Sequence, residues 1–139
     1  MERFAPLLED QDEVITHSYV SDIRMPSGRV IALITLDNGK DHTRPNTLGP
    51  HTLLQFAGKL DELKERAKNN EIHGVAVTGK PYFLAAGADL SKVQDIKDRH
   101  VGRLIAELGH YALGKLDEVG VTSFVFINGL ALGGGLEIA

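Results

Sequence analysis

Apolar and polar residues recur with two different periods along the chain, and these periods predict where strands and helices lie. Residues 13–23 and 30–36 predict two strands separated by a Pro-Ser-Gly turn at 26–28, and the second is apolar enough to lie inside a sheet. Apolar residues at every third or fourth position after Pro50 predict an amphipathic helix that ends near residue 70. A polar loop, residues 37–49, joins the second strand to this helix.

The second half of the chain repeats the order of strand and helix. Asp89 or Ser91 is expected to cap the second long helix, which runs in one or two pieces. The alternating order predicts an α/β fold with an at least partly parallel sheet. The predicted elements are a strand at 73–78, a loop at 79–89, a helix ending at Glu118, a strand at 121–127 and a helix beginning at Leu136.

Length and charge exclude several classes of protein. A chain of 139 residues forms at most one domain, and a net charge of −4 argues against a nucleic-acid partner, which normally needs a basic surface. The sequence has no cysteine and begins without the basic and apolar run of a signal peptide, which fits a cytoplasmic protein. Residues 119–136 carry no charge, but five glycines among them argue against a membrane span. No membrane partner is expected.

Three familiar chemistries find no support. Residues 74–80 match the letters of a phosphate-binding P-loop, but Pro81 follows the lysine and the middle residues read as strand. The six histidines lack metal-ligand spacing, so no metal site is expected, and His42 is interpreted as a solvated loop residue. No Gly-x-Ser-x-Gly motif supports a nucleophilic serine.

Two runs of small residues remain as candidates for a site. Residues 83–90 read Phe-Leu-Ala-Ala-Gly-Ala-Asp-Leu, and residues 127–137 contain three consecutive glycines at the start of a helix, followed by Glu137. Small residues leave backbone N–H groups accessible, and two such groups can converge on one oxygen and stabilise an oxyanion. Taken singly, each run has an equally good structural explanation: Asp89 as a helix cap, close helix–sheet packing of glycines, and Glu137 at a helix dipole.

In this pair of runs the sequence closely resembles the crotonase, or enoyl-CoA hydratase/isomerase, superfamily. The similarity extends from about Val30 to the last residue, through the motifs Asn-Thr-Leu at 46–48, Ala-Gly-Ala-Asp at 86–89, Asn-Gly at 128–129, and Glu137. Residues 36–45 look most like the hydratase part of bacterial multifunctional β-oxidation enzymes, in which a 3-hydroxyacyl-CoA dehydrogenase region follows. The resemblance implies a crotonase-like ββα superhelix, truncated here, with residues 1–139 as the N-terminal portion of one domain.

The resemblance also implies roles for particular residues. The N–H groups of Ala88 and Gly134 would hold the thioester oxygen as it becomes an enolate, and Glu137 would act on the attacking water. The predicted coenzyme A contacts are Asn46, Ala86, Gly87, Ala88 and Asp89, with the 37–49 loop lining the same site. Family members carry a second glutamate about twenty residues beyond Glu137, outside this chain.

The expected function is hydration of a 2-enoyl-CoA thioester in fatty-acid β-oxidation. The reaction needs no cofactor besides the coenzyme A carried by the substrate, and the family implies a homo-oligomer, a trimer or hexamer. Two alternatives stay open: a Δ3-Δ2 enoyl-CoA isomerase or other crotonase, which one carboxylate suits better than hydration, and a non-catalytic acyl-CoA-binding or assembly module. An incomplete domain is also expected to expose apolar surface.

Overall fold

A computed structural model describes residues 2–9, 12–89, 92 and 96–139. The chain forms a mixed α/β fold, as the order of elements predicts. The elements are η1 (Glu2–Leu8, a 3-10 helix), β1 (His17–Arg24), β2 (Val30–Asp37), α1 (Pro50–Lys68), β3 (Gly74–Gly79), β4 (Tyr82–Ala85), α3 (Arg99–Glu118), β5 (Thr122–Val125), β6 (Gly129–Ala131) and α4 (Gly134–Glu137).

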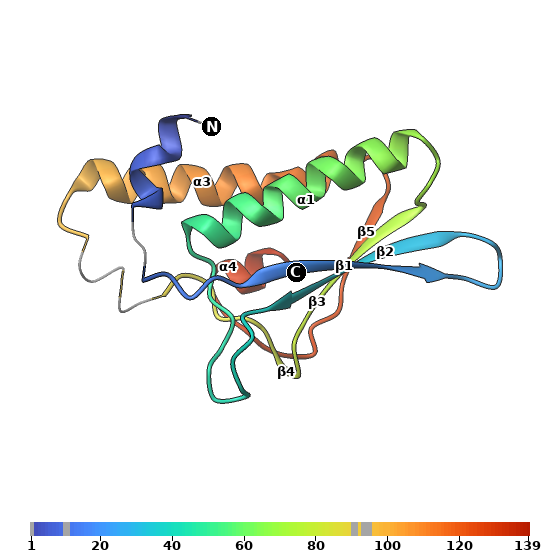
Figure 1. Cartoon of the computed structure of the whole chain (residues 1–139), viewed down its shortest axis with the longest axis horizontal. Coiled ribbons are helices and arrows are strands. Elements are labelled where there is room, and N and C mark those ends of the chain that lie inside the picture. The colour runs from blue at the N-terminus through green and yellow to red at the C-terminus, as the bar shows by residue number, and fades with distance from the viewer. Residues whose placement is uncertain (1, 10–11, 90–91, 93–95) are drawn as a thin grey trace.

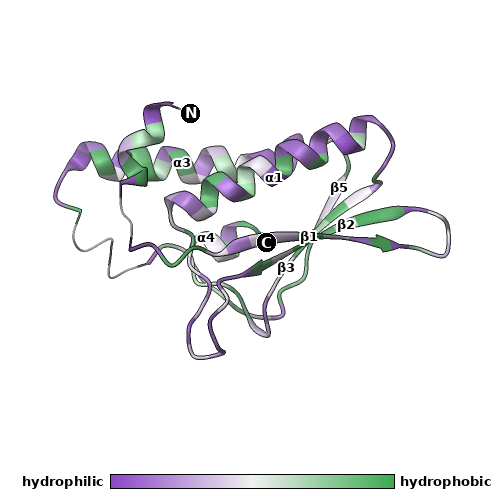
Figure 2. Ribbon diagram, in the orientation of Figure 1, coloured by the Kyte–Doolittle hydropathy of each residue, from purple (hydrophilic) through white to green (hydrophobic). Residues whose placement is uncertain are grey.

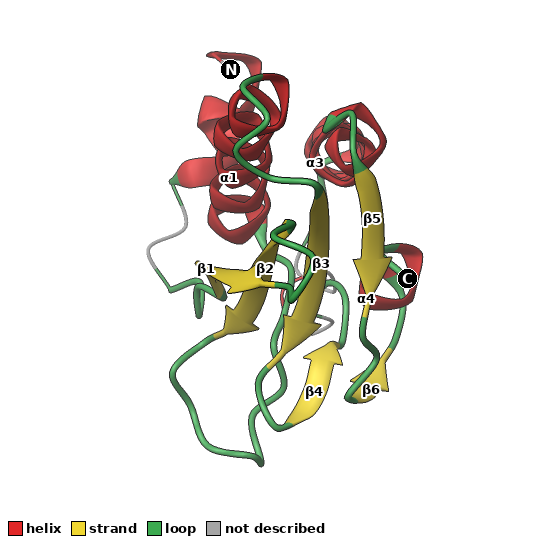
Figure 3. Ribbon diagram, turned by 90° about the vertical axis from the view of Figure 1, so that its right-hand side faces the viewer, coloured by secondary structure: helices red, strands yellow, loops and turns green. Residues whose placement is uncertain are grey.

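The main sheet has four strands in the order β1-β2-β3-β5. β1 pairs antiparallel with β2, whereas β2–β3 and β3–β5 pair in parallel, which confirms the partly parallel sheet. β4 and β6 form a second, two-stranded parallel sheet. Helices α1 and α3 lie side by side in one layer above the main sheet, and β4 and β6 lie on the opposite side of it from these helices (Figure 1, Figure 3).

The core lies between the helix layer and the sheet. Every second residue of β2 is buried, beginning with Val30, and all of Gly74–Val77 in β3 is buried, as expected for a central strand. α1 turns an apolar face inward, with Leu53, Phe56, Leu60 and Leu63 buried against the sheet and α3. Figure 2 shows the largely hydrophobic β2 below α1 and α3, whose ribbons carry both hydrophilic and hydrophobic residues.

The structure differs from the sequence prediction where elements are short. The predicted 79–89 loop contains strand β4, the predicted 121–127 strand ends at Val125, and β6 was not predicted. The last helix begins at Gly134 rather than Leu136. Asp98 caps α3, with its carboxylate accepting from the His100 N–H. A first helical piece that Asp89 or Ser91 would cap falls largely on residues 90–95, most of which lie outside the described residues, as does Ser91 itself.

Large apolar side chains are exposed on β5, β6 and α4 and on the segments that join them. They are Phe124, Phe126, Ile127, Leu130, Leu132 and Leu136. Among the described residues, no helix combines the length and the apolar character that a membrane span requires.

Candidate active site

The segment 85–88 is held between two other stretches of backbone. On one side the Ala86 N–H donates to the Asn46 carbonyl at 2.8 Å, and the Leu48 N–H donates to the Gly87 carbonyl at 2.8 Å. On the other side the Leu132 N–H donates to the Ala85 carbonyl at 3.0 Å. The two runs of small residues that the sequence singles out are therefore neighbours in space, about forty-five residues apart in the chain.

Gly87 and Gly134 lie close together where these two runs meet. Gly87 has φ +79°, in the left-handed region, and a Cβ atom built on it would lie 2.9 Å from the Gly134 amide nitrogen. A side chain at position 87 would thus be both strained and obstructed. Because residue 87 is glycine, its backbone can pack against the amide of Gly134, next to Ala88.

Two N–H groups at this junction have no acceptor among the described residues. Over the described parts of the chain, the amide of Ala88 and the amide of Gly134, the first residue of α4, donate to no acceptor. A backbone donor without a protein acceptor is available to water or to a ligand. Both amides assigned to the oxyanion site by resemblance have this property.

The structure places Ala88 and Glu137 in different hollows. Ala88 lines a small pocket of about 70 Å³ together with Glu13, Leu48 and Asp89. Glu137 lines a larger pocket of about 520 Å³ beside His110 and the carboxyl end of the chain. The Glu137 side chain is exposed in this arrangement.

The other predicted coenzyme A contacts divide into buried and accessible groups. Asn46 has 0% exposure, and its side-chain N–H group donates to the Leu36 carbonyl at 2.8 Å and the Leu84 carbonyl at 3.1 Å. Ala86 is half-buried and Asp89 lines two pockets. Asn46 therefore joins β2 to β4 and supports the 85–88 segment, while Asp89 is placed where it can face a ligand.

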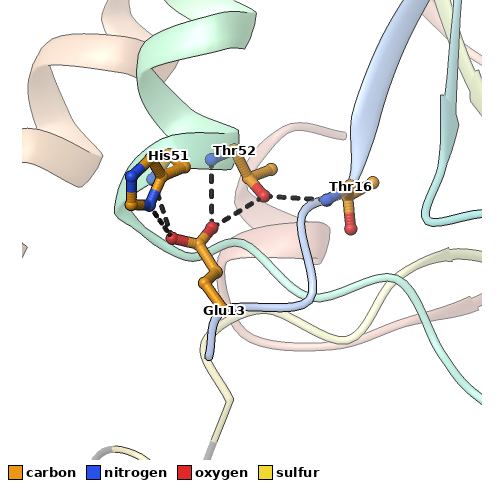
Figure 4. Close-up of polar contacts among 4 residues, drawn as sticks. All are labelled: Glu13, Thr16, His51 and Thr52. Atoms are coloured by element: carbon orange, nitrogen blue, oxygen red, sulfur yellow. Dashed lines mark hydrogen bonds and ion pairs between the residues drawn. The ribbon is translucent and has the colours of Figure 1, made fainter. Parts of the chain in front are cut away.

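Sequence reasoning missed a carboxylate that lies in the same pocket as Ala88. The Glu13 side chain, 9% exposed, reaches the first turn of α1, where one oxygen accepts from the His51 N–H at 2.9 Å and from His51 Nδ1 at 2.8 Å. Its other oxygen accepts from the Thr52 N–H at 3.1 Å and the Thr52 hydroxyl at 3.0 Å (Figure 4). Glu13 thus caps α1, whose own N-cap residue, Gly49, offers no side chain.

Glycine at position 49 is what allows this carboxylate to dock. A Cβ atom built on Gly49 would overlap the side chain of Glu13. Thr52 extends the same network, because its hydroxyl oxygen accepts from the Thr16 N–H at 2.9 Å (Figure 4). A signal was present in the sequence: a helix that begins at Gly-Pro, without a capping side chain of its own, needs a cap from elsewhere.

The 37–49 loop contributes a second, more polar pocket. Lys40, Arg44, Thr47 and Asp89 line this hollow of about 300 Å³. Within the loop, hydrogen bonds from the Thr43 hydroxyl and N–H hold the pKa of Asp41 below its ordinary value. The cations and the carboxylates of this region give it the mixed charge typical of a site for a polar ligand.

Over the described residues no group of three His, Asp or Glu side chains is arranged to hold a metal ion. Within the described residues the arrangement offers two backbone amides without an acceptor, a small pocket beside one of them, and a second pocket lined by Lys40, Arg44 and Asp89. Such a set of groups can bind a carbonyl oxygen and an anionic ligand that lies across the loop.

Known proteins show the same architecture. No family model matches the chain. It is 32% identical over 110 residues to the fatty acid oxidation complex subunit alpha of Shewanella amazonensis, a match that covers 78% of this chain and 15% of that protein. Among solved structures, DspI of Pseudomonas aeruginosa is 30% identical with a TM-score of 0.72, over 94% of this chain and 46% of DspI.

A more distant structure agrees on the fold. The enoyl-CoA hydratase of Bacillus anthracis superimposes with a TM-score of 0.70 at 23% identity, covering 88% of this chain and 43% of the hydratase. The chain thus has a crotonase fold, and the predicted resemblance to the crotonase superfamily is confirmed. It spans under half the length of these two structures and 15% of the fatty acid oxidation subunit.

Proposed function

We propose that this chain forms the coenzyme A thioester site of an enoyl-CoA hydratase. The observation that carries the proposal is the contact of Gly87 with the Gly134 amide, which brings together two runs whose free N–H groups belong to Ala88 and Gly134. Similarity to a fatty acid oxidation subunit and to a solved enoyl-CoA hydratase supports the same activity.

In the proposed reaction the two amides donate to the thioester oxygen of a 2-enoyl-CoA. Water adds its oxygen to C3, the π electrons of the C2–C3 bond move onto the thioester oxygen, and a proton lost by the water is balanced by one gained at C2. Each well-placed oxyanion donor stabilises such a transition state by about 3–4 kcal/mol. Glu137 would take the proton from water, with a second carboxylate supplied beyond this chain.

The position of Glu137 favours a second candidate. Glu137 lines the pocket near His110 rather than the pocket of Ala88, which supports a chain that binds the thioester without acting on water. A chain of this kind would bind acyl-CoA thioesters without hydrating them. An isomerase remains the alternative chemistry, because moving one proton needs a single carboxylate.

Titration of the chain with coenzyme A and crotonyl-CoA, with hydration followed by loss of the enoyl thioester absorbance, tests both candidates. We expect binding of both ligands. Turnover that Glu137→Gln abolishes without weakening coenzyme A binding supports the hydratase, with Glu62→Gln on the exposed face of α1 as control. Binding without turnover supports the second candidate. Absence of binding at millimolar ligand would contradict both.

The remaining expectations concern the context of the site. We propose that the protein acts on acyl-CoA thioesters in the cytoplasm as a homo-oligomer, and that a 3-hydroxyacyl-CoA dehydrogenase region accompanies it. The fatty acid oxidation subunit supports this arrangement, since this chain corresponds to 15% of its length. Mass photometry and the reading frame around the coding sequence test the two points separately.

A further inference from the structure

Lys80 carries a buried ammonium group that the proposed chemistry does not use. The residue is 5% exposed and follows the last residue of β3. Its Nζ donates to four oxygens: Asn38 Oδ1 at 2.6 Å and the carbonyls of Arg44 at 2.6 Å, Lys40 at 2.9 Å and Asp41 at 3.1 Å. All four acceptors are uncharged, and among the described residues Lys80 forms no ion pair.

A buried cation whose four hydrogen-bond acceptors are all uncharged is an unfavourable choice for stability alone, although the nearby Asp41 carboxylate interacts with it through its charge. Removing an ammonium from water is costly, and an apolar side chain of similar length would avoid that cost. The four oxygens compensate by surrounding Nζ much as ligands surround a bound cation. A lysine here therefore calls for a role that an apolar residue could not fill, and the residues supplying the oxygens indicate which role.

The oxygens come from one loop, residues 38–44, which the ammonium gathers around itself. Asn38 closes the loop further, because its Oδ1 also accepts from the Lys40 N–H at 3.0 Å and its Nδ2 donates to the Pro45 carbonyl at 2.9 Å. Without the ammonium, three loop carbonyls would point at each other around an empty space. The conformation of the loop therefore depends on the charge of Lys80.

The backbone of Lys80 is itself fixed to the sheet. Its N–H donates to the Leu36 carbonyl at 2.9 Å, and Asn128 Nδ2 donates to the carbonyls of Gly79 at 2.9 Å and Lys80 at 2.8 Å. The ammonium thus connects the rigid ends of β2 and β3 to the loop. The same loop carries Lys40 and Arg44, whose side chains line the polar pocket beside Asp89.

We propose that Lys80 is a positioning residue that holds residues 38–45 so that Lys40 and Arg44 meet the phosphate groups of the nucleotide part of a coenzyme A thioester. This inference rests on the proposed function, and names the residue that organises its cationic pocket. Lys80 itself touches no ligand, since its protons are all donated within the protein.

Binding of two ligands to Lys80→Met and to the original chain tests the inference. One ligand is butyryl-CoA and the other is butyryl-pantetheine, which keeps the thioester and lacks the nucleotide. We expect Lys80→Met to weaken butyryl-CoA binding about tenfold, which corresponds to the loss of one or two charge-assisted hydrogen bonds to the phosphate groups. The affinity for butyryl-pantetheine should change by no more than about twofold. Lys68→Met, which removes an exposed lysine at the end of α1, serves as the matched control.

A second variant guards against simple misfolding. Lys80→Ala removes three methylene groups and the ammonium, which n-propylammonium can replace. We expect n-propylammonium to restore butyryl-CoA binding, whereas tetramethylammonium at equal ionic strength, which has no N–H to donate, does not. Amide hydrogen exchange of residues 38–45 should slow in parallel with the rescue.

The outcomes distinguish a positioning role of Lys80 from a purely structural one, and both from a failure of the proposed function. Equal losses for butyryl-CoA and butyryl-pantetheine would mean that Lys80 merely stabilises the fold, and would overturn the inference. Unchanged butyryl-CoA binding in Lys80→Met would also overturn it, while leaving the proposed function intact. If the original chain binds neither ligand, the proposed function itself is contradicted, whatever the amide hydrogen exchange of residues 38–45 shows.

Discussion

The amide nitrogen of Gly134 lies where a side chain on Gly87 would have to go. A Cβ atom at position 87 would come within 2.9 Å of that nitrogen, and one at position 134 would lie 4.0 Å from the Gly87 Cα. The two residues follow the two paired strands of the second sheet: Gly87 comes after β4, and Gly134 comes after β6, at the start of α4. Their contact determines how the amides of Ala88 and Gly134 are placed relative to each other.

Substituting Gly87 with alanine should damage both stability and binding. The left-handed φ of +79° costs an L-residue about 1–2 kcal/mol, and the new methyl group would push against Gly134. Urea unfolding and coenzyme A titration of Gly87→Ala measure the two effects.

The matched control is Gly109→Ala in α3, where an added Cβ meets nothing within 4 Å. Because alanine favours a helix over glycine by about 0.5–1 kcal/mol, this variant should be slightly more stable. A Gly87→Ala chain as stable as the original, with unchanged coenzyme A affinity, would show that the contact has no role in the site.

Removing the carboxylate of Glu13 should loosen the start of α1. Glu13→Ala leaves the N–H groups of His51 and Thr52 without their acceptor, a loss of about 1–3 kcal/mol in the free energy of unfolding. Leu48, whose N–H holds the Gly87 carbonyl, lies two residues before this turn. We therefore expect weaker ligand binding as well as lower stability.

A double-mutant cycle with Gly49 isolates the contact between the two residues. Gly49→Ala should be costly in the original chain, where the methyl group overlaps the Glu13 side chain, and much less so in Glu13→Ala. The expected coupling is on the order of 1 kcal/mol, measured by urea unfolding of the four chains. Additive losses would contradict the proposed packing.

We expect Asn46 to stabilise the fold rather than to contact the ligand directly. Its buried side chain serves the carbonyls of Leu36 and Leu84, and its Oδ1 accepts from the Asn38 N–H at 3.1 Å. Asn46→Ala leaves these groups unsatisfied and should cost about 2–4 kcal/mol in unfolding free energy, against about 0.5 kcal/mol or less for the exposed Asn69→Ala. A direct ligand contact would instead lower coenzyme A affinity while leaving the urea midpoint unchanged.

The longer elements follow from local sequence, whereas the small second sheet does not. β2, α1 and β3 each combine a clear period with boundaries set by turn residues, so they form where the pattern predicts. β4 and β6 have four and three residues, too few for a period. They become strands because they pair with each other, and Gly129 packs directly on the Tyr82 carbonyl.

In the candidate site, too, some features follow from local sequence and others arise only from tertiary contacts. The two runs of small residues could be recognised because their composition is unusual and their joint order resembles a known family. The Gly-Pro start of α1 signals that a cap is needed, but it does not identify Glu13, since 38 residues separate Glu13 from His51 and nothing local marks this glutamate. Lys80 was visible only as part of a failed P-loop motif, and its cage exists because the fold brings the 38–44 carbonyls around it.

Titration of Asp41 at acidic pH tests the hydrogen bonds that hold the turn at Asp41 and Thr43. Asp41 Oδ1 accepts from the Thr43 hydroxyl at 2.6 Å and from the Thr43 N–H at 2.8 Å, which keeps the pKa of Asp41 below its ordinary value. Because the pKa is lowered in the folded state, the stabilisation of this turn is present above the ordinary pKa of an aspartate and is lost as the pH falls through the folded-state pKa. Thr43→Val should raise the Asp41 pKa towards its ordinary value, whereas Thr43→Ser, which keeps a hydroxyl, should leave it low. Carboxyl-carbon NMR titration measures both, and equal pKa values in the valine and serine variants would contradict the role of the hydroxyl.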